Sequence, residues 1–218
     1  MFESEKKQLI EAAQELEKKG LVVGTAGNLS LRVKDPNGRE LMAITPSGRY
    51  YHSLKVDDIV VVDFSGQKVE SELKASIETP MHLEVLKARK KMNAIVHAHA
   101  VNCSAVAVAR MDIPPLIDEQ VILLGGEIKV AEYAFPGTPE LARSAVAGLG
   151  PRNAVLLANH GVLTVGRNIR EALTFCELAE ELAKIYTTAL SLGKVNQLPA
   201  EAVELEKAFF AATYGEDH

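Results

Sequence analysis

The stretch Ala94-Ile95-Val96-His97-Ala98-His99-Ala100 decides the fold, because an apolar run leads directly into two histidines separated by one residue. Side chains of an extended strand alternate between its two faces, so residues 97 and 99 point the same way. Two imidazoles placed in this manner can bind one metal ion. The stretch therefore predicts a buried strand whose end carries part of a metal site.

A third histidine, His160, lies between two further apolar runs, at residues 154–159 and 161–165. The glycine that follows it, Gly161, favours a turn that projects the imidazole into a cleft. Each histidine taken alone is more often a hydrogen-bonded core residue. The three together favour a zinc site with a displaceable fourth ligand, which is the catalytic kind.

The remaining histidines and the cysteines are weaker candidates for chemistry. His52 follows two tyrosines, His82 lies close enough to Glu78 in sequence to be an outer partner of the metal ligands, and His218 is the last residue. Cys103 and Cys176 are the only cysteines, which is too few for a disulfide scaffold. We expect both to be buried, unpaired thiols.

Hydrophobic spacing predicts helices on both sides of a strand-rich middle. The predicted helices are 3–19, 79–91 (with Thr79 as cap and Pro80 in the first turn), 101–109, 138–149, 169–190 and 199–212. The predicted strands are 21–33, 40–45, 59–64, the run ending at His97, a pair within 121–133, 154–159 and 161–165. This order favours an α/β fold of three layers, αβα, around a mixed, mainly antiparallel sheet.

Composition excludes several classes of function. With 218 residues, of which 47% are hydrophobic, we expect one domain spanning 1–218. The net charge is −5 and the basic residues are scattered, which argues against a nucleic-acid partner. No run reaches the ~18 apolar residues that a membrane span needs, and the charged start lacks the form of a signal peptide. A protein of the cytoplasm without a membrane partner is expected.

Two glycine-containing loops have the composition of a phosphate site. The loops 24–30 (GTAGNLS) and 44–48 (ITPSG) combine glycines, which let a backbone approach a ligand, with hydroxyl and amide donors. A glycine-containing hairpin would explain either loop alone. Together the two loops could hold a phosphate through neutral donors, as a backbone nest does. Neither loop has the lysine of an ATP-binding P-loop, so ATP chemistry is not supported.

As an ordered set, these segments resemble the class II aldolase/adducin family, and within it the branch that acts on L-fuculose 1-phosphate. The resemblance covers essentially the whole chain. It is carried by GTAGNLS at 24–30, ITPSG at 44–48, SIE at 76–78 with His82, VHAHA at 96–100 and LANHG at 157–161.

The resemblance implies a homotetramer with active sites near the subunit interfaces and one Zn²⁺ per subunit. The zinc would be held by His97, His99 and His160. Glu78 would be the catalytic acid/base and would also bind zinc in the resting enzyme. Without the resemblance, Glu78 would be interpreted as a helix-start carboxylate that interacts with the macrodipole.

Further roles follow from the same resemblance. Tyr214 matches a C-terminal tyrosine that closes on the substrate, and Glu119 stands where the fuculose branch has a tyrosine that protonates the aldehyde oxygen. Ile77 replaces a serine that donates to phosphate. The residues implied to bind the substrate phosphate are Thr25, Gly27, Asn28, Ser47, Gly48 and Ser76.

The activity implied is cleavage of a sugar 1-phosphate, such as L-fuculose 1-phosphate, to dihydroxyacetone phosphate and an aldehyde, L-lactaldehyde. An L-ribulose-5-phosphate 4-epimerase is the alternative within the family, although that enzyme has an aspartate at the position of Glu78. A dehydratase of a related sugar phosphate would use nearly the same residues. A non-catalytic scaffold, as in adducin, need not keep the three histidines.

Overall fold

The computed structural model describes residues 1–215, which excludes His218. Its strands form one eight-stranded sheet in the order β4-β3-β2-β1-β5-β8-β7-β6. All neighbouring strands are antiparallel except β6 and β7, which are parallel. The strands are β1 (Asn28–Lys34), β2 (Glu40–Ile44), β3 (Val60–Asp63), β4 (Lys68–Glu70), β5 (Ala94–Ala98), β6 (Lys129–Ala131), β7 (Ala154–Leu157) and β8 (Gly161–Gly166).

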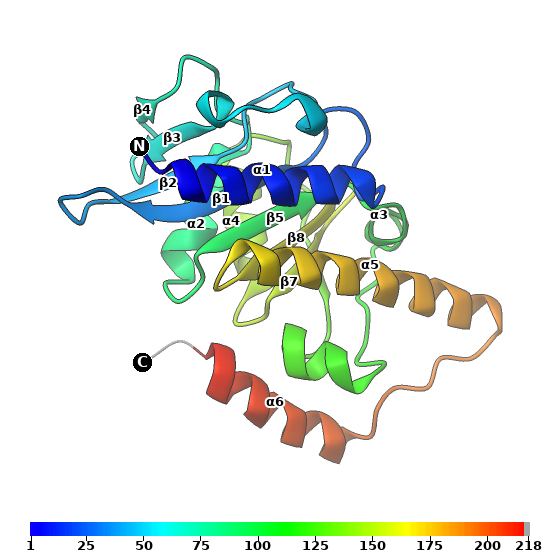
Figure 1. Cartoon of the computed structure of the whole chain (residues 1–218). Helices are drawn as coiled ribbons and strands as arrows, with labels where there is room; N and C mark the ends of the chain where they lie inside the picture. The colour runs from blue at the N-terminus through cyan, green and yellow to red at the C-terminus, as the bar shows by residue number, and fades with distance from the viewer. Residues whose placement is uncertain (216–218) are drawn as a thin grey trace.

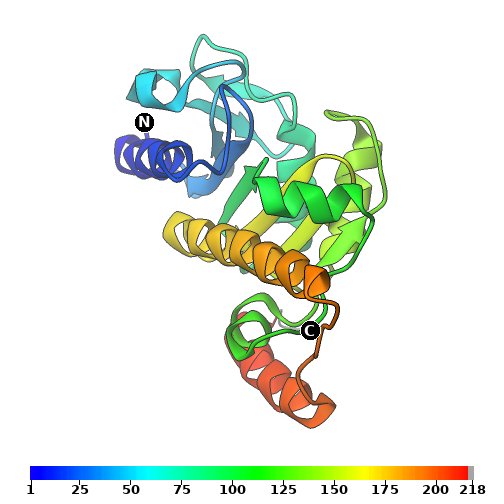
Figure 2. The same ribbon diagram turned by 90° about the vertical axis from the view of Figure 1, so that its right-hand side faces the viewer.

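Helices cover both faces of this sheet, as Figures 1 and 2 show. The helices are α1 (Glu3–Lys18), α2 (Thr79–Ala88), α3 (Val101–Val108), α4 (Pro139–Leu149), α5 (Ile169–Ser191) and α6 (Ala200–Tyr214), with short turns η1 (Tyr51–Ser53), η2 (Val56–Asp58) and η3 (Gln120–Leu124). Helices α1, α3 and α5 pack on one face, α2 and α4 pack on the other, and α6 packs against η3. The predicted three-layer αβα fold with a mainly antiparallel sheet is confirmed.

Strand β1 shows how the sequence sets the two faces. Leu29 and Leu31 are buried on the face covered by α1, which contacts this strand. The alternate residues Asn28 and Ser30 are also buried, yet they bond to Glu78 and His82 at the start of α2. Because strand side chains alternate, one strand supplies an apolar surface to the core and a polar surface to a site.

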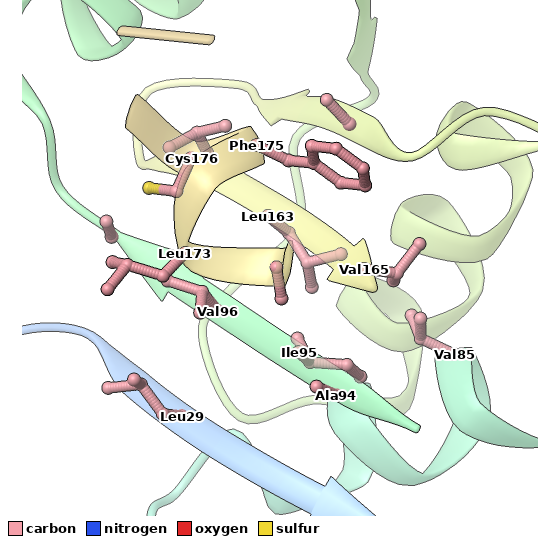
Figure 3. Packing of buried hydrophobic residues seen from close by; sticks show 14 of the residues in the cluster. Leu29, Val85, Ala94, Ile95, Val96, Leu163, Val165, Leu173, Phe175 and Cys176 are labelled. Atoms are coloured by element: carbon pink, nitrogen blue, oxygen red, sulfur yellow. The ribbon is translucent and has the colours of Figure 1, made fainter. Parts of the chain in front are cut away.

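The core is continuous through the sheet and both helical layers. Figure 3 shows part of it, with Val96 of β5, Val85 of α2 and Leu173 of α5 among the labelled side chains. Cys103 and Cys176 are free and buried, as predicted. Within residues 1–215, no helix combines the length and the apolar character that crossing a membrane requires.

The structure corrects the start of one strand and the start of one helix. The predicted strand 21–33 begins only at Asn28, because residues 24–27 form a loop in which Gly27 has a φ of 74°. A Cβ atom on Gly27 would lie 2.6 Å from the carbonyl oxygen of His97, so this position requires glycine. Thr79 is not the cap of α2, since Glu78 occupies the N-cap position and Pro80 lies in the first turn.

Of the two strands predicted within residues 121–133, the first does not form. Residues Gln120–Leu124 form the π-helical turn η3, and only Lys129–Ala131 form a strand. The buried amide of Gln120 explains the difference, because its Nε2 donates to the carbonyl oxygens of Pro114 and Gly126, each at 3.0 Å. These bonds satisfy loop carbonyls that a strand pairing would otherwise satisfy.

Candidate metal centre

His97 is the most firmly held of the three histidines. It lies on the central strand β5, opposite Asn28 of β1 and Leu163 of β8, and its side chain is fully buried. Its Nδ1 lies 2.9 Å from the carbonyl oxygen of Val162. If Nδ1 carries the proton that this bond requires, Nε2 is left with a free lone pair for a metal ion.

The other two histidines converge on that nitrogen. His99 follows the end of β5, and its Nε2 lies 3.1 Å from Nε2 of His97. His160 lies in the turn before β8, and the centroid of its ring is 4.7 Å from that of His97 and 4.8 Å from that of His99. The spacing of these three residues predicts a shared site, and in the structure their rings lie next to one another.

The donor set fits a divalent metal ion. One ligand nitrogen from each histidine lies within 4.8 Å of the others. The Glu78 carboxylate adjoins them, with Oε2 at 3.2 Å from His97 Nε2 and Oε1 at 3.5 Å from His160 Nε2. Ligands of one tetrahedral zinc ion are roughly 3.3 Å apart. Three imidazoles and one carboxylate at these separations would need little movement to bind Zn²⁺.

Burial keeps the imidazoles in the neutral form that binds metal. It lowers the pKa of His97 and of His99, and it lowers the pKa of His160 to about 4. Neutral imidazole is the ligand form of histidine. At neutral pH, therefore, a metal ion has few protons to displace from these rings.

Glu78 is a buried carboxylate held by specific partners. Its side chain accepts a hydrogen bond of 2.8 Å from Nδ2 of Asn28, and its backbone N–H donates to Oγ of Ser76 at 3.2 Å. Burial alone would raise its pKa, but the neighbouring His97 and the bond from Asn28 lower it, and the net pKa lies below the ordinary value. The group is therefore an anion that can bind a metal or accept a proton.

His82 lies beneath Glu78, one helical turn further along α2. It is fully buried, and its Nδ1 is 2.7 Å from Oγ of Ser30. Burial, together with the nearby His97, lowers its pKa to about 3, so it is neutral. Its described hydrogen bond goes to Ser30, so an outer role for His82 behind the metal ligands stays a prediction. His52 lies elsewhere and bonds to Glu17.

The two predicted phosphate loops lie side by side with a third segment. The Leu29 N–H donates to Oγ1 of Thr45 at 3.1 Å, which joins the first loop to the second. The Ser47 N–H donates to the carbonyl oxygen of Lys74 at 2.9 Å, and Pro46 pairs with Ala75, which joins the second loop to the segment before Glu78. The predicted phosphate ligands therefore come from three connected segments.

The individual members of this set differ in accessibility. Thr25, Ser47 and Gly48 are exposed, whereas Ser76 is buried and accepts the Glu78 N–H. Asn28 is buried, and its Nδ2 atom, which carries two N–H donors, donates to Glu78. The phosphate assignments themselves stay predictions.

Glu119 and Tyr214 do not join the histidines within the chain. Glu119 is exposed at the start of η3, near Glu206 of α6. Tyr214 is buried, its hydroxyl lies 3.3 Å from Glu171, and Arg167 stacks on its ring. Arg167 follows the last residue of β8 whereas His160 precedes the first, so Tyr214 lies by the end of β8 opposite to the metal ligands.

Sequence reasoning missed the contacts of Asn28 with Glu78 and of Ser30 with His82. Two signals were available. Asn28 and Ser30 are polar residues two apart in an otherwise apolar strand, and Glu78 and His82 are four apart where a helix begins. Both pairs put polar groups on one face of their element.

Comparisons with a family model and with known proteins assign this chain to the same family. A family model described as the class II aldolase and adducin N-terminal domain matches residues 7–187. A 5-deoxy-D-ribulose 1-phosphate aldolase from Bacillus thuringiensis is 33% identical over 96% of this chain and 97% of its own. An L-fuculose phosphate aldolase from Haemophilus influenzae is 35% identical over 95% of this chain and 94% of its own.

A solved structure agrees with these relatives. A protein described as L-fuculose 1-phosphate aldolase superposes with a TM-score of 0.89 at 40% sequence identity, covering 95% of this chain and 96% of its own. The fold is therefore that of the proteins that the sequence resembles.

Proposed function

Because this chain belongs to the class II aldolase and adducin family, we propose that it is a zinc-dependent lyase that cleaves a sugar 1-phosphate to dihydroxyacetone phosphate and an aldehyde. L-Fuculose 1-phosphate, which would give L-lactaldehyde, is the first candidate substrate. A 5-deoxyribulose 1-phosphate would give the same phosphate product, and relatives carry both names.

The observation that supports this proposal most directly is the convergence of three histidine rings beside a buried carboxylate. His97, His99, His160 and, at rest, Glu78 would hold the ion. When bound, a divalent ion supplies stabilisation of the negative charge that develops on the substrate oxygens as the carbon–carbon bond breaks.

Glu78 would transfer the proton. In cleavage, the hydroxyl group that becomes the aldehyde oxygen gives up its proton as the carbon–carbon bond breaks, and Glu119 of a neighbouring subunit would accept this proton. Glu78, after taking a proton from solvent, would donate it to the carbon of the dihydroxyacetone phosphate fragment that lost its partner. In condensation, Glu78 removes the proton from the same carbon. Asn28 would orient the carboxylate, since its amide already donates to Oε2.

Thr25, Gly27, Asn28, Ser47, Gly48 and Ser76 would hold the phosphate through neutral donors. Tyr214 and Glu119 would act only in an assembled homotetramer, at the site of a neighbouring subunit. This would account for their separation from the histidines of their own chain. Light scattering of the purified protein tests the assembly.

A product assay tests the function. The purified protein is incubated with L-fuculose 1-phosphate and, separately, with 5-deoxyribulose 1-phosphate, with and without a chelator. Dihydroxyacetone phosphate formed from either substrate, and lost with the chelator, supports the proposal. Epimerised or dehydrated products without cleavage would contradict it.

A further inference from the structure

We propose that Glu180 of α5 is a positioning residue of the metal centre, because it holds the amino end of α3 and thereby the segment that carries His99. This inference deepens the proposed function and rests on it only in that the three histidines bind a divalent ion.

Helix α3 starts directly after the histidine pair and has no cap of its own. Its N-cap residue is Ala100, which has no side-chain oxygen and makes no capping bond. The first backbone N–H groups of a helix have no partner within the helix and need an external acceptor. In this helix the acceptor comes from another element.

Glu180 supplies that acceptor with both of its oxygens. Oε1 accepts from the backbone N–H of Asn102 at 2.9 Å and from its Nδ2 at 2.7 Å, and Oε2 accepts from the backbone N–H of Cys103 at 2.9 Å. A carboxylate that receives three hydrogen bonds at a helix amino end is also stabilised by the helix dipole. The amino end of α3 is therefore bound to the long helix α5.

His99 depends on this anchor more than His97 does. His97 is held by pairing on both sides and by the carbonyl oxygen of Val162. His99 lies beyond the last residue of β5, and among residues 1–215 its ring makes one hydrogen bond, to His97 itself. Its backbone is consequently positioned by the strand before it and by α3 after it.

The same helix also contacts the loop of the third histidine. Oγ of Ser104 in α3 donates to the carbonyl oxygen of His160 at 3.4 Å, and Nη2 of Arg110, two residues beyond the end of α3, donates to Oδ1 of Asn159 at 2.6 Å. Helix α3 thus connects both ligand segments that lie outside regular strands. Displacing its amino end would disturb the spacing of the imidazoles without removing any of them.

The test compares metal affinity in four variants. Glu180→Gln keeps the size of the side chain but removes the charge and one acceptor, and Asn102→Ala removes one of the three bonds while keeping the carboxylate. Glu181→Gln is the matched control, since Glu181 is the exposed neighbour of Glu180. Glu70→Gln is a control for lowered stability, because Glu70 lies on β4, three strands from β1.

Zn²⁺ affinity is measured by competition with a chromophoric chelator, and the Co²⁺-substituted proteins are compared by visible absorption. Loss of a residue that bonds directly to a metal ligand weakens metal binding by about 10–100-fold. Glu180 acts through Asn102 and Cys103 and not on a ligand itself, so the lower end of this range applies. We expect Glu180→Gln to weaken Zn²⁺ binding by about tenfold and to change the Co²⁺ spectrum, Asn102→Ala to do so to a smaller extent, and both controls to match the parent.

The outcomes separate this inference from the proposed function. Zn²⁺ affinity and Co²⁺ spectrum unchanged in Glu180→Gln would overturn the positioning role, as would an equal loss of affinity in Glu70→Gln. If Glu180→Gln does not fold, Asn102→Ala decides by the same two measurements. A parent protein that binds one zinc ion but cleaves neither sugar phosphate would refute the function and leave the role of Glu180 intact.

Discussion

The amide of Asn28 donates a hydrogen bond of 2.8 Å to the Oε2 atom of Glu78, whose Oε2 lies 3.2 Å from the Nε2 atom of His97. This contact joins strand β1, strand β5 and the start of α2 at a single carboxylate. Asn28 and His97 are direct cross-strand neighbours, so the sheet register sets the distance between them. The carboxylate is consequently oriented before any ligand arrives.

Replacing Asn28 by alanine should impair catalysis by disturbing Glu78. The hydrogen bond from Asn28 is one of the causes that lower the pKa of Glu78, so its removal should raise that pKa. We expect the acidic limb of the rate–pH profile to move to higher pH and kcat to fall by about tenfold or more. The exposed residue Asn37 provides the control, because Asn37→Ala should leave the profile unchanged.

Substituting Glu78 by glutamine should separate proton transfer from folding. The amide has nearly the same shape but does not accept a proton at neutral pH, so we expect kcat to fall by about 10²–10⁴-fold. The thermal unfolding midpoint is measured in parallel. A well-folded Glu78→Gln protein with near-native turnover would rule out the acid/base role.

Metal content should depend on the three clustered histidines and not on His52. We expect His97→Ala and His160→Ala to lose the bound ion, which the parent should carry at one equivalent per subunit. His52 bonds to Glu17 at the surface, so His52→Ala should retain the ion. Elemental analysis of the purified proteins makes the comparison, and zinc retained by His97→Ala would argue against this site.

Removing Glu70 should destabilise the fold without affecting the metal centre. Its carboxylate bonds to the ammonium of the buried Lys6 at 2.9 Å and to the chain's amino terminus at 2.6 Å. Glu70→Gln leaves the Lys6 charge in place with a weaker partner, so we expect a loss of about 1–3 kcal/mol in the free energy of unfolding. Urea denaturation measures it.

The same ion pair predicts a dependence of stability on pH. Burial would raise the pKa of Glu70, but the bonds from the amino terminus and Lys6 lower it, and the net value is below the ordinary 4.5. A carboxyl with a lowered folded-state pKa stabilises the fold above its unfolded pKa, and this contribution disappears as the pH falls through the folded value. The difference in stability between parent and Glu70→Gln should therefore shrink below about pH 4.5. A constant difference down to strongly acidic pH would contradict the assignment.

The sequence gives most of the regular elements because their signals are local. The helix at Glu3–Lys18 and the strand at Gly161–Gly166 lie where apolar periodicity predicts them. One error falls where a buried polar side chain overrides the apolar pattern beside it. Apolar residues 121–124 have the composition of a strand, yet the Gln120 amide satisfies nearby loop carbonyls and a π-helical turn forms instead.

Residue types and spacing by themselves determined that His97, His99 and His160 form the candidate metal site and that helices on two sides enclose a mainly antiparallel sheet. Only the tertiary structure decided which groups support that site, namely Asn28 for Glu78, Ser30 for His82 and Glu180 for the segment of His99. It also placed Glu119 and Tyr214 apart from the histidines of their own chain. The physical reason is that spacing along a chain sets the face on which a side chain lies, whereas sheet register and helix packing set which distant face it meets.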